Sequence, residues 1–91
     1  MSSPELSPEL EYTEVADDQL NELEATDASL YNAILAACEL IGRNPSLAQS
    51  MSAAVRTDNG MVLRYPVPDR YPYKVFWSSV GPRIEAVFPY K

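Results

Sequence analysis

The sequence predicts a small α+β protein in which a helical hairpin packs on an antiparallel sheet. Three observations predict it: an apolar pattern of helical period in the first half, β-branched and aromatic runs in the second half, and an Asn-Gly pair at 59–60 between two such runs. Ninety-one residues suffice for one core. We expect a single domain over 10–91. Residues 1–9 repeat Ser-Pro-Glu-Leu with little to bury, which predicts a mobile N-terminal arm.

The first element of the domain is predicted to be a short strand that leads into a helix. Residues 10–12 alternate in polarity as a strand does. Thr13 follows them and suits the N-cap of a helix, because its hydroxyl can accept a hydrogen bond from a free backbone N–H. Ala16, Leu20 and Leu23 then recur at helical spacing, which gives this helix one apolar stripe.

A second helix, more deeply buried than the first, is predicted to begin after Asp27 and to end near Gly42 and Pro45. Its apolar positions recur at helical spacing: Leu30, Ile34, either Ala37 or Cys38, and Ile41. We expect the thiol to be a small core group rather than a nucleophile. A single cysteine also permits no disulfide within the monomer and fits a reducing compartment.

The second half is predicted to form four strands, which completes the order β-α-α-β-β-β-β. Runs at 53–56 and 61–65 flank the turn, and three prolines make 66–72 a rigid loop. The run at 73–77 is dense in β-formers, with Tyr73 and Trp77 expected in the core. After a turn at 79–82, the strand 83–88 is expected to place Ile84, Ala86 and Phe88 on one face.

Charge is distributed unevenly along the chain. Residues 1–42 carry ten acidic side chains and no basic ones, whereas residues 43–91 carry seven basic and three acidic side chains, for a net charge of −6. A local field can steer a partner whatever the total charge, so a two-faced molecule is one interpretation. A solvated helix face with scattered surface arginines is the other.

In this order and spacing, five segments resemble the RelE/ParE superfamily of bacterial and archaeal toxins. They are residues 12–16, 44–47, 60–67, 71–77 and 84–88, so the resemblance covers nearly the whole domain. It implies a toxin of a type II toxin–antitoxin pair that inhibits growth by binding either the translating ribosome and its mRNA or DNA gyrase. It also implies neutralisation by a cognate antitoxin protein, and neither a metal nor another cofactor.

The resemblance also points to candidate site residues. Arg64 and Lys74 match the basic positions of the family's central strands, and Tyr90 belongs to the tail; these three are candidate catalytic residues. A ribonuclease needs a proton acceptor for the attacking 2′-hydroxyl and cations around the phosphorane. The further candidates are assigned to target binding: Arg56, Arg70, Arg83 and Lys91.

Two departures from the family favour binding over cleavage. Family nucleases usually continue into a tail with an arginine and an aromatic, whereas this sequence stops at Lys91, and its net charge is acidic. A degenerate RelE-fold protein that acts as a protein-binding module is therefore an alternative. An unrelated α+β interaction domain that uses its acidic helical face is another.

The remaining expectations concern location and assembly. No stretch approaches the length of a membrane span and no signal peptide precedes the domain, so we expect a cytoplasmic protein without a membrane partner. Exposed sheet edges also make a homodimer possible.

Overall fold

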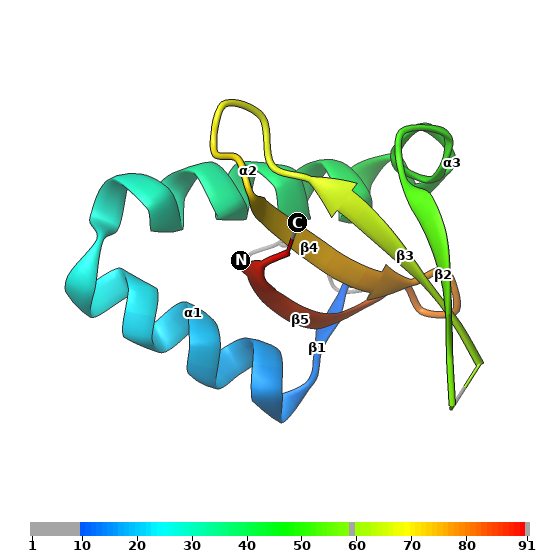
Figure 1. The fold of residues 1–91 in the computed structure, drawn as a ribbon, viewed down its shortest axis with the longest axis horizontal. Coiled ribbons are helices and arrows are strands. Elements are labelled where there is room, and N and C mark those ends of the chain that lie inside the picture. Colours follow the sequence, from blue (N-terminus) through cyan, green and yellow to red (C-terminus); the bar gives the residue numbers. More distant parts are fainter. Residues whose placement is uncertain (1–9, 59, 91) are drawn as a thin grey trace, which may run out of the picture.

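A computed structural model describes residues 10–58 and 60–90 of the chain, and in it helices cover one face of a five-stranded sheet (Figure 1). In chain order the elements are β1 (Glu11–Tyr12), α1 (Glu14–Thr26), α2 (Ala28–Arg43), α3 (Pro45–Ser50), β2 (Ala53–Thr57), β3 (Gly60–Pro66), β4 (Tyr73–Ser78) and β5 (Arg83–Pro89). The predicted α+β class is confirmed. The predicted arm over residues 1–9 lies outside the described residues.

The two long helices begin where their capping side chains predict. The Oγ1 atom of Thr13 accepts a hydrogen bond from the backbone N–H of Ala16 at 3.1 Å. The Oδ1 atom of Asp27 accepts one from the N–H of Leu30 at 3.2 Å. Each bond satisfies one of the N–H groups that a helix start leaves without an intrahelical partner. Local sequence therefore fixes where both helices begin.

A third, short helix was not predicted. Asn44 closes α2 and also caps α3, because its Oδ1 atom accepts a hydrogen bond from the N–H of Leu47 at 3.3 Å. Pro45 then occupies the first turn of α3, where its missing N–H costs nothing. The same Pro45 that ends α2 therefore starts the next helix.

The sheet is mixed rather than purely antiparallel. Its strand order is β1-β5-β4-β3-β2, and β1 runs parallel to β5 while the other pairs are antiparallel. The N–H of Thr13 donates to the carbonyl of Ile84 at 3.0 Å and continues this parallel contact beyond β1. The N-terminal strand is thus held against the last strand of the chain.

Beyond β1, side chains of the helical layer cap the outer edge of β5. The Oγ1 hydroxyl of Thr13 donates to the carbonyl of Glu85 at 2.6 Å. The Oε1 atom of Gln19 in α1 accepts from the N–H of Val87, also at 2.6 Å. These bonds replace those of a neighbouring strand, so this edge offers fewer free backbone groups for pairing with another chain.

Two details of the strand boundaries differ from the prediction. Pro66 belongs to β3, where it pairs with Lys74, and not to the loop. It is tolerated because β2 extends only as far as Ala53, opposite Arg64, so β3 is an edge strand at this point. The hairpin between β2 and β3 is confirmed, but Gly60 pairs with Thr57 and starts β3, with a φ of 124°.

A β-bulge changes which side chains of β5 face the core. Trp77 lies opposite Ile84, but Phe76 lies opposite Ala86, so β5 carries one extra residue at this point. The expectation that Ile84, Ala86 and Phe88 share a face is therefore wrong. Ile84 faces the core with Trp77, whereas Ala86 and Phe88 point to the opposite face, because the extra residue reverses the alternation.

The core lies between the helices and the sheet. Both Trp77 and Cys38, predicted as core residues, are buried there, and Tyr73 packs against it half-buried. The Nε1 hydrogen of Trp77 is satisfied by the Oγ atom of Ser52 at 3.1 Å. The buried residues of this core are Ala16, Leu20, Leu30, Ile34, Ala37, Cys38, Ile41, Ala48, Tyr65, Val67, Val75, Trp77, Ile84 and Val87.

Candidate functional site

The face of the sheet that the helices leave open carries the three candidate catalytic residues. Strand register puts Arg64 of β3 opposite Phe76 of β4, and Lys74 of β4 opposite Phe88 of β5. Residues opposite each other in neighbouring strands share a face, so these four side chains form one surface. Tyr90, just beyond β5, contacts the same surface. The structure therefore brings Arg64, Lys74 and Tyr90 together.

Three aromatic rings form the centre of this surface. The rings of Phe76 and Phe88 stack with centroids 4.7 Å apart and planes at 16°. The ring of Tyr90 meets them edge-on, with its centroid 5.5 Å from that of Phe76 and 6.4 Å from that of Phe88. Phe76 is only 8 % exposed, but Phe88 is 36 % and Tyr90 42 % exposed. We call the exposed rings of Phe88 and Tyr90, which pack on the buried ring of Phe76, the aromatic platform.

Two cations flank this platform. The guanidinium carbon of Arg64 lies 5.1 Å from the centre of the Tyr90 ring, and the ammonium of Lys74 lies 5.2 Å from the centre of the Tyr71 ring. Both distances are within the range of cation–π attraction. Within residues 10–58 and 60–90, neither cation forms a salt bridge. Their positive charge is therefore uncompensated by a carboxylate of the described chain.

Lys74 also holds backbone groups. Its Nζ atom donates to the carbonyl of Tyr90 at 3.0 Å and to the carbonyl of Pro72 at 3.3 Å. The N–H of Tyr90 donates to that same Pro72 carbonyl at 2.9 Å. The segment after β5 is thereby tied to the loop before β4.

The candidate target-binding residues do not join this cluster. The Nε atom of Arg83 forms a salt bridge at 2.8 Å with Oε2 of Glu85, which also accepts from the hydroxyl of Ser78. Arg70 donates to Ser29 at the start of α2. Arg56 lies in β2 opposite Met61, near the hairpin turn. Lys91 lies outside the described residues.

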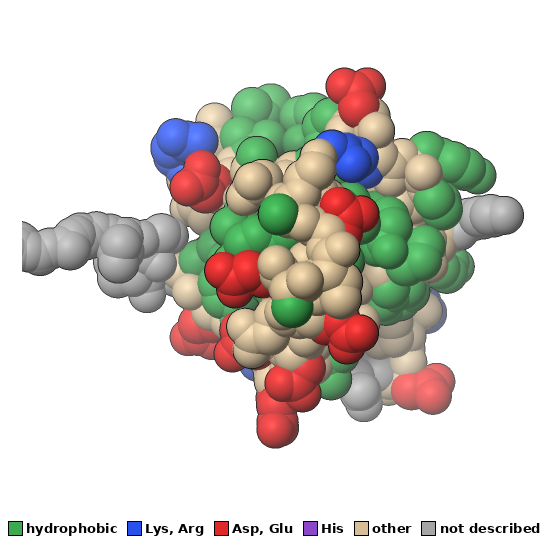
Figure 2. Space-filling model, turned by 90° about the vertical axis from the view of Figure 1, so that its left-hand side faces the viewer, with side chains coloured by type: hydrophobic (Ala, Val, Ile, Leu, Met, Phe, Trp, Pro, Cys, Tyr) green, Lys and Arg blue, Asp and Glu red, His purple; other side chains and the backbone are tan. Residues whose placement is uncertain are grey.

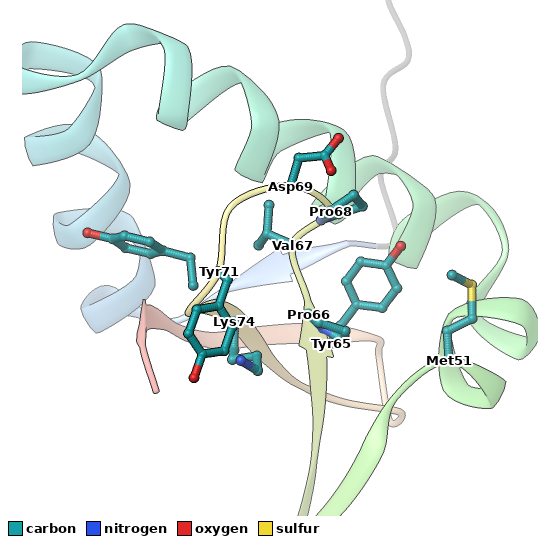
Figure 3. Close-up of a pocket in the computed structure, with 9 residues that line it drawn as sticks. Met51, Tyr65, Pro66, Val67, Pro68, Asp69, Tyr71 and Lys74 are labelled. Atoms are coloured by element: carbon teal, nitrogen blue, oxygen red, sulfur yellow. The ribbon is translucent and has the colours of Figure 1, made fainter. Parts of the chain in front are cut away.

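An open groove of about 600 Å³ adjoins the cluster where β2 stops short of the end of β3. Figure 3 shows Met51 beside Tyr65 at one end of this groove, and Tyr71 with Lys74 at the other. Pro66, Val67 and Pro68 line it between these ends. The lining is therefore mostly apolar, with a cation where the groove meets the open face.

Acidic side chains gather on another part of the surface. Figure 2 shows them at the end of the molecule where α1 meets α2. The exposed acids of α1 are Glu14, Asp17, Asp18, Glu22 and Glu24. Acidic side chains therefore gather on α1, and the cations Arg64 and Lys74 lie on the open face. The separation is partial, because Arg43 ends α2 and Arg70 donates to Ser29 at the start of α2.

Phe76 and Phe88 are the members of the surface that sequence reasoning missed. The signal for Phe76 was present, since a strand that buries Val75 and Trp77 must turn the residue between them to the other face. For Phe88 the signal misled, because regular alternation from Ile84 takes no account of the bulge.

Within residues 10–58 and 60–90, no group of three or more cysteine and carboxylate side chains is placed to hold a metal ion. No described helix combines the length and apolar character needed to cross a bilayer. Burial raises the pKa of the Cys38 thiol to about 12, which keeps it protonated and a poor nucleophile near neutral pH.

An aromatic platform flanked by cations suits flat anionic partners, because rings stack on the exposed aromatics while the cations attract phosphates or carboxylates. In comparisons with known proteins, no family model, curated protein or solved structure matches this chain.

Proposed function

We propose that this chain is a RelE/ParE-like toxin of a type II toxin–antitoxin pair, which inhibits growth by binding a macromolecular target and is neutralised by a cognate antitoxin. The convergence of Arg64, Lys74 and Tyr90 on the open face of the sheet carries this proposal. The resemblance put these three residues at the site, and they are far apart in the sequence.

Single-stranded RNA is the target that suits the chemistry of this surface best. Exposed aromatic rings such as Phe88 and Tyr90 can stack with unpaired bases, at about 1–3 kcal/mol per base. Arg64 beside them can contact a phosphate, because no described carboxylate occupies its guanidinium. We propose that an unpaired strand, such as an mRNA during translation, binds across the sheet. DNA gyrase is the alternative target within the same family.

The same surface supports binding more strongly than cleavage. The sequence contains no histidine, and Glu85 is occupied by Arg83 and Ser78. Within the described cluster, Lys74 and Tyr90 carry the groups that could exchange a proton with a 2′-hydroxyl, and the Lys74 ammonium already donates to two carbonyls. A weakly active or inactive ribonuclease that still blocks its target is therefore the proposed mechanism.

Induced expression with parallel RNA-binding measurements tests this proposal. The unaltered chain should arrest growth, and the combined change Arg64→Ala with Lys74→Ala should abolish the arrest. A labelled unpaired RNA of about twelve nucleotides should bind the unaltered chain, and Arg64→Ala should weaken binding about tenfold. Arg43→Ala is the matched control, because it removes one exposed positive charge at the end of α2, away from the cluster and from the candidate target-binding residues. Retained toxicity in the double variant would exclude these residues from the site.

A degenerate relative that serves as a protein-binding module is the second candidate. The net charge of −6 and the exposed acids of α1 favour it, because they weaken attraction to a polyanion and offer a surface to a basic protein. A chain that neither arrests growth nor binds RNA would support this candidate over the first.

A further inference from the structure

We propose that Lys74 is a positioning residue that latches the segment after β5 onto the loop before β4 and so fixes the Tyr90 ring beside Arg64. This gives Lys74 a role different from that of a catalytic or phosphate-binding lysine. The contribution to RNA binding rests on the proposed function, but the latch itself does not.

Hydrogen bonds link the Lys74 ammonium, the carbonyl of Pro72 and the backbone of Tyr90 to one another. The carbonyl of Pro72 accepts both from Lys74 Nζ at 3.3 Å and from the N–H of Tyr90 at 2.9 Å. The ammonium then donates to the carbonyl of Tyr90 at 3.0 Å. Both backbone polar groups of Tyr90 are thus tied to the segment at 72–74. A side chain of Lys74 that left this position would release the Tyr90 carbonyl directly.

The latch matters because little else holds this segment. Pro89 ends β5 opposite Tyr73, and beyond it the N–H of Tyr90 makes the last backbone hydrogen bond between the two strands, to the carbonyl of Pro72 at 2.9 Å. Tyr90 is 42 % exposed, and its ring contacts are with Phe76, Phe88 and Arg64 on the open face. Its position therefore depends on the latch and on the rings of Phe76 and Phe88.

The two cations consequently have different capacities for a ligand. An ammonium has three hydrogens, of which Lys74 commits two to carbonyls while its charge lies near the Tyr71 ring. Arg64 has five guanidinium hydrogens, and none of them forms a hydrogen bond or salt bridge with the described residues. Its guanidinium lies over the Tyr90 ring. We therefore expect Arg64 to contact an anionic group directly, whereas Lys74 contributes to binding by holding Tyr90 in position.

Amide hydrogen exchange tests the latch without any ligand. In Lys74→Met, which keeps the aliphatic stem and removes the donors, the Tyr90 amide should exchange about tenfold faster, the factor expected for one hydrogen bond of ordinary net strength. Lys74→Arg retains donors for both carbonyls and should keep the rate within about twofold. Arg43→Met controls for the lost charge and should leave the rate unchanged, because Arg43 is exposed at the end of α2. An unchanged rate in Lys74→Met overturns the latch.

A double-mutant cycle on RNA affinity then separates positioning from direct contact. The probe is a labelled adenosine homopolymer of about twelve nucleotides. If Lys74 acts through Tyr90, Lys74→Met combined with Tyr90→Ala should weaken binding no more than Tyr90→Ala alone, about tenfold. If Lys74 meets a phosphate, the two losses multiply and the salt dependence falls by about one counterion, which overturns positioning. If the unaltered chain binds no RNA, the proposed function fails, and the exchange rates alone decide the latch.

Discussion

Replacing Gln19 with leucine removes the side chain that caps the outer edge of β5. In the native chain its Oε1 atom accepts from the N–H of Val87 at 2.6 Å, and Val87 is only 2 % exposed. Leucine has a similar size but no acceptor. The N–H of Val87 would then be left without a partner at a site that excludes most water.

The expected loss follows from this burial. A buried backbone donor left unsatisfied costs about 1–3 kcal/mol, more than the net value of an ordinary hydrogen bond. For a domain of this size, a loss near 2 kcal/mol corresponds to a fall in Tm of roughly 8–16 °C. Gln19→Glu keeps an acceptor oxygen in place and should lose less than about 1 kcal/mol.

Urea unfolding followed by circular dichroism measures these losses. Gln49→Leu is the matched control, because Gln49 is an exposed glutamine of α3 and its replacement should change stability by less than about 0.5 kcal/mol. Exchange of the Val87 amide should also accelerate in Gln19→Leu. If Gln19→Leu unfolds at the same urea concentration as Gln49→Leu, the side chain of Gln19 does not cap this edge.

Two further predictions concern the core. Ser52→Ala should lower the free energy of unfolding by about 1–3 kcal/mol, measured in urea, because it leaves the Nε1 hydrogen of fully buried Trp77 unpaired. A loss below about 0.5 kcal/mol would contradict that hydrogen bond. Burial raises the pKa of the Cys38 thiol from 9.0 to about 12, so between these pH values the unfolded chain binds fewer protons and stability should fall as pH rises. Between pH 8 and pH 10, stability should fall less in Cys38→Ala, by about 1.4 kcal/mol in total, because the unfolded thiol with its pKa of 9.0 titrates in the middle of this range. The pKa of Tyr12 is also raised by burial, so part of the fall should persist in that variant, and equal slopes would show that Cys38 does not contribute.

Local signals were sufficient for most of the fold. Thr13 and Asp27 were readable as helix caps because capping involves neighbours three positions along the chain. The hairpin at 57–60 was readable for the same reason. The start of α3 is harder to predict, because Pro45 gives two signals. A proline after a helical run indicates the end of that helix, but Asn44 followed by Pro45 is also a signal for the start of a new one.

The candidate site was predicted only in part, because its geometry depends on contacts between distant strands. Arg64, Lys74 and Tyr90 came from the resemblance, and nothing local indicates that a lysine of β4 binds the carbonyl of Tyr90. The bulge opposite Phe76 depends on the register between β4 and β5 and leaves no clear mark in the sequence. Phe88 was consequently expected on the wrong face.

The parallel contact between β1 and β5 has a consequence for synthesis on the ribosome. It pairs Tyr12 with Ile84, and the hydrogen bond beside it joins Thr13 to Glu85, 72 positions later in the chain. The helices emerge first, but their apolar stripes have no sheet to cover until the last strands leave the exit tunnel. The same late segment supplies Phe88 and Tyr90 to the open face. The nascent chain therefore completes its core and its proposed binding surface in one late step, after the last strand of the domain has been synthesised and has left the exit tunnel.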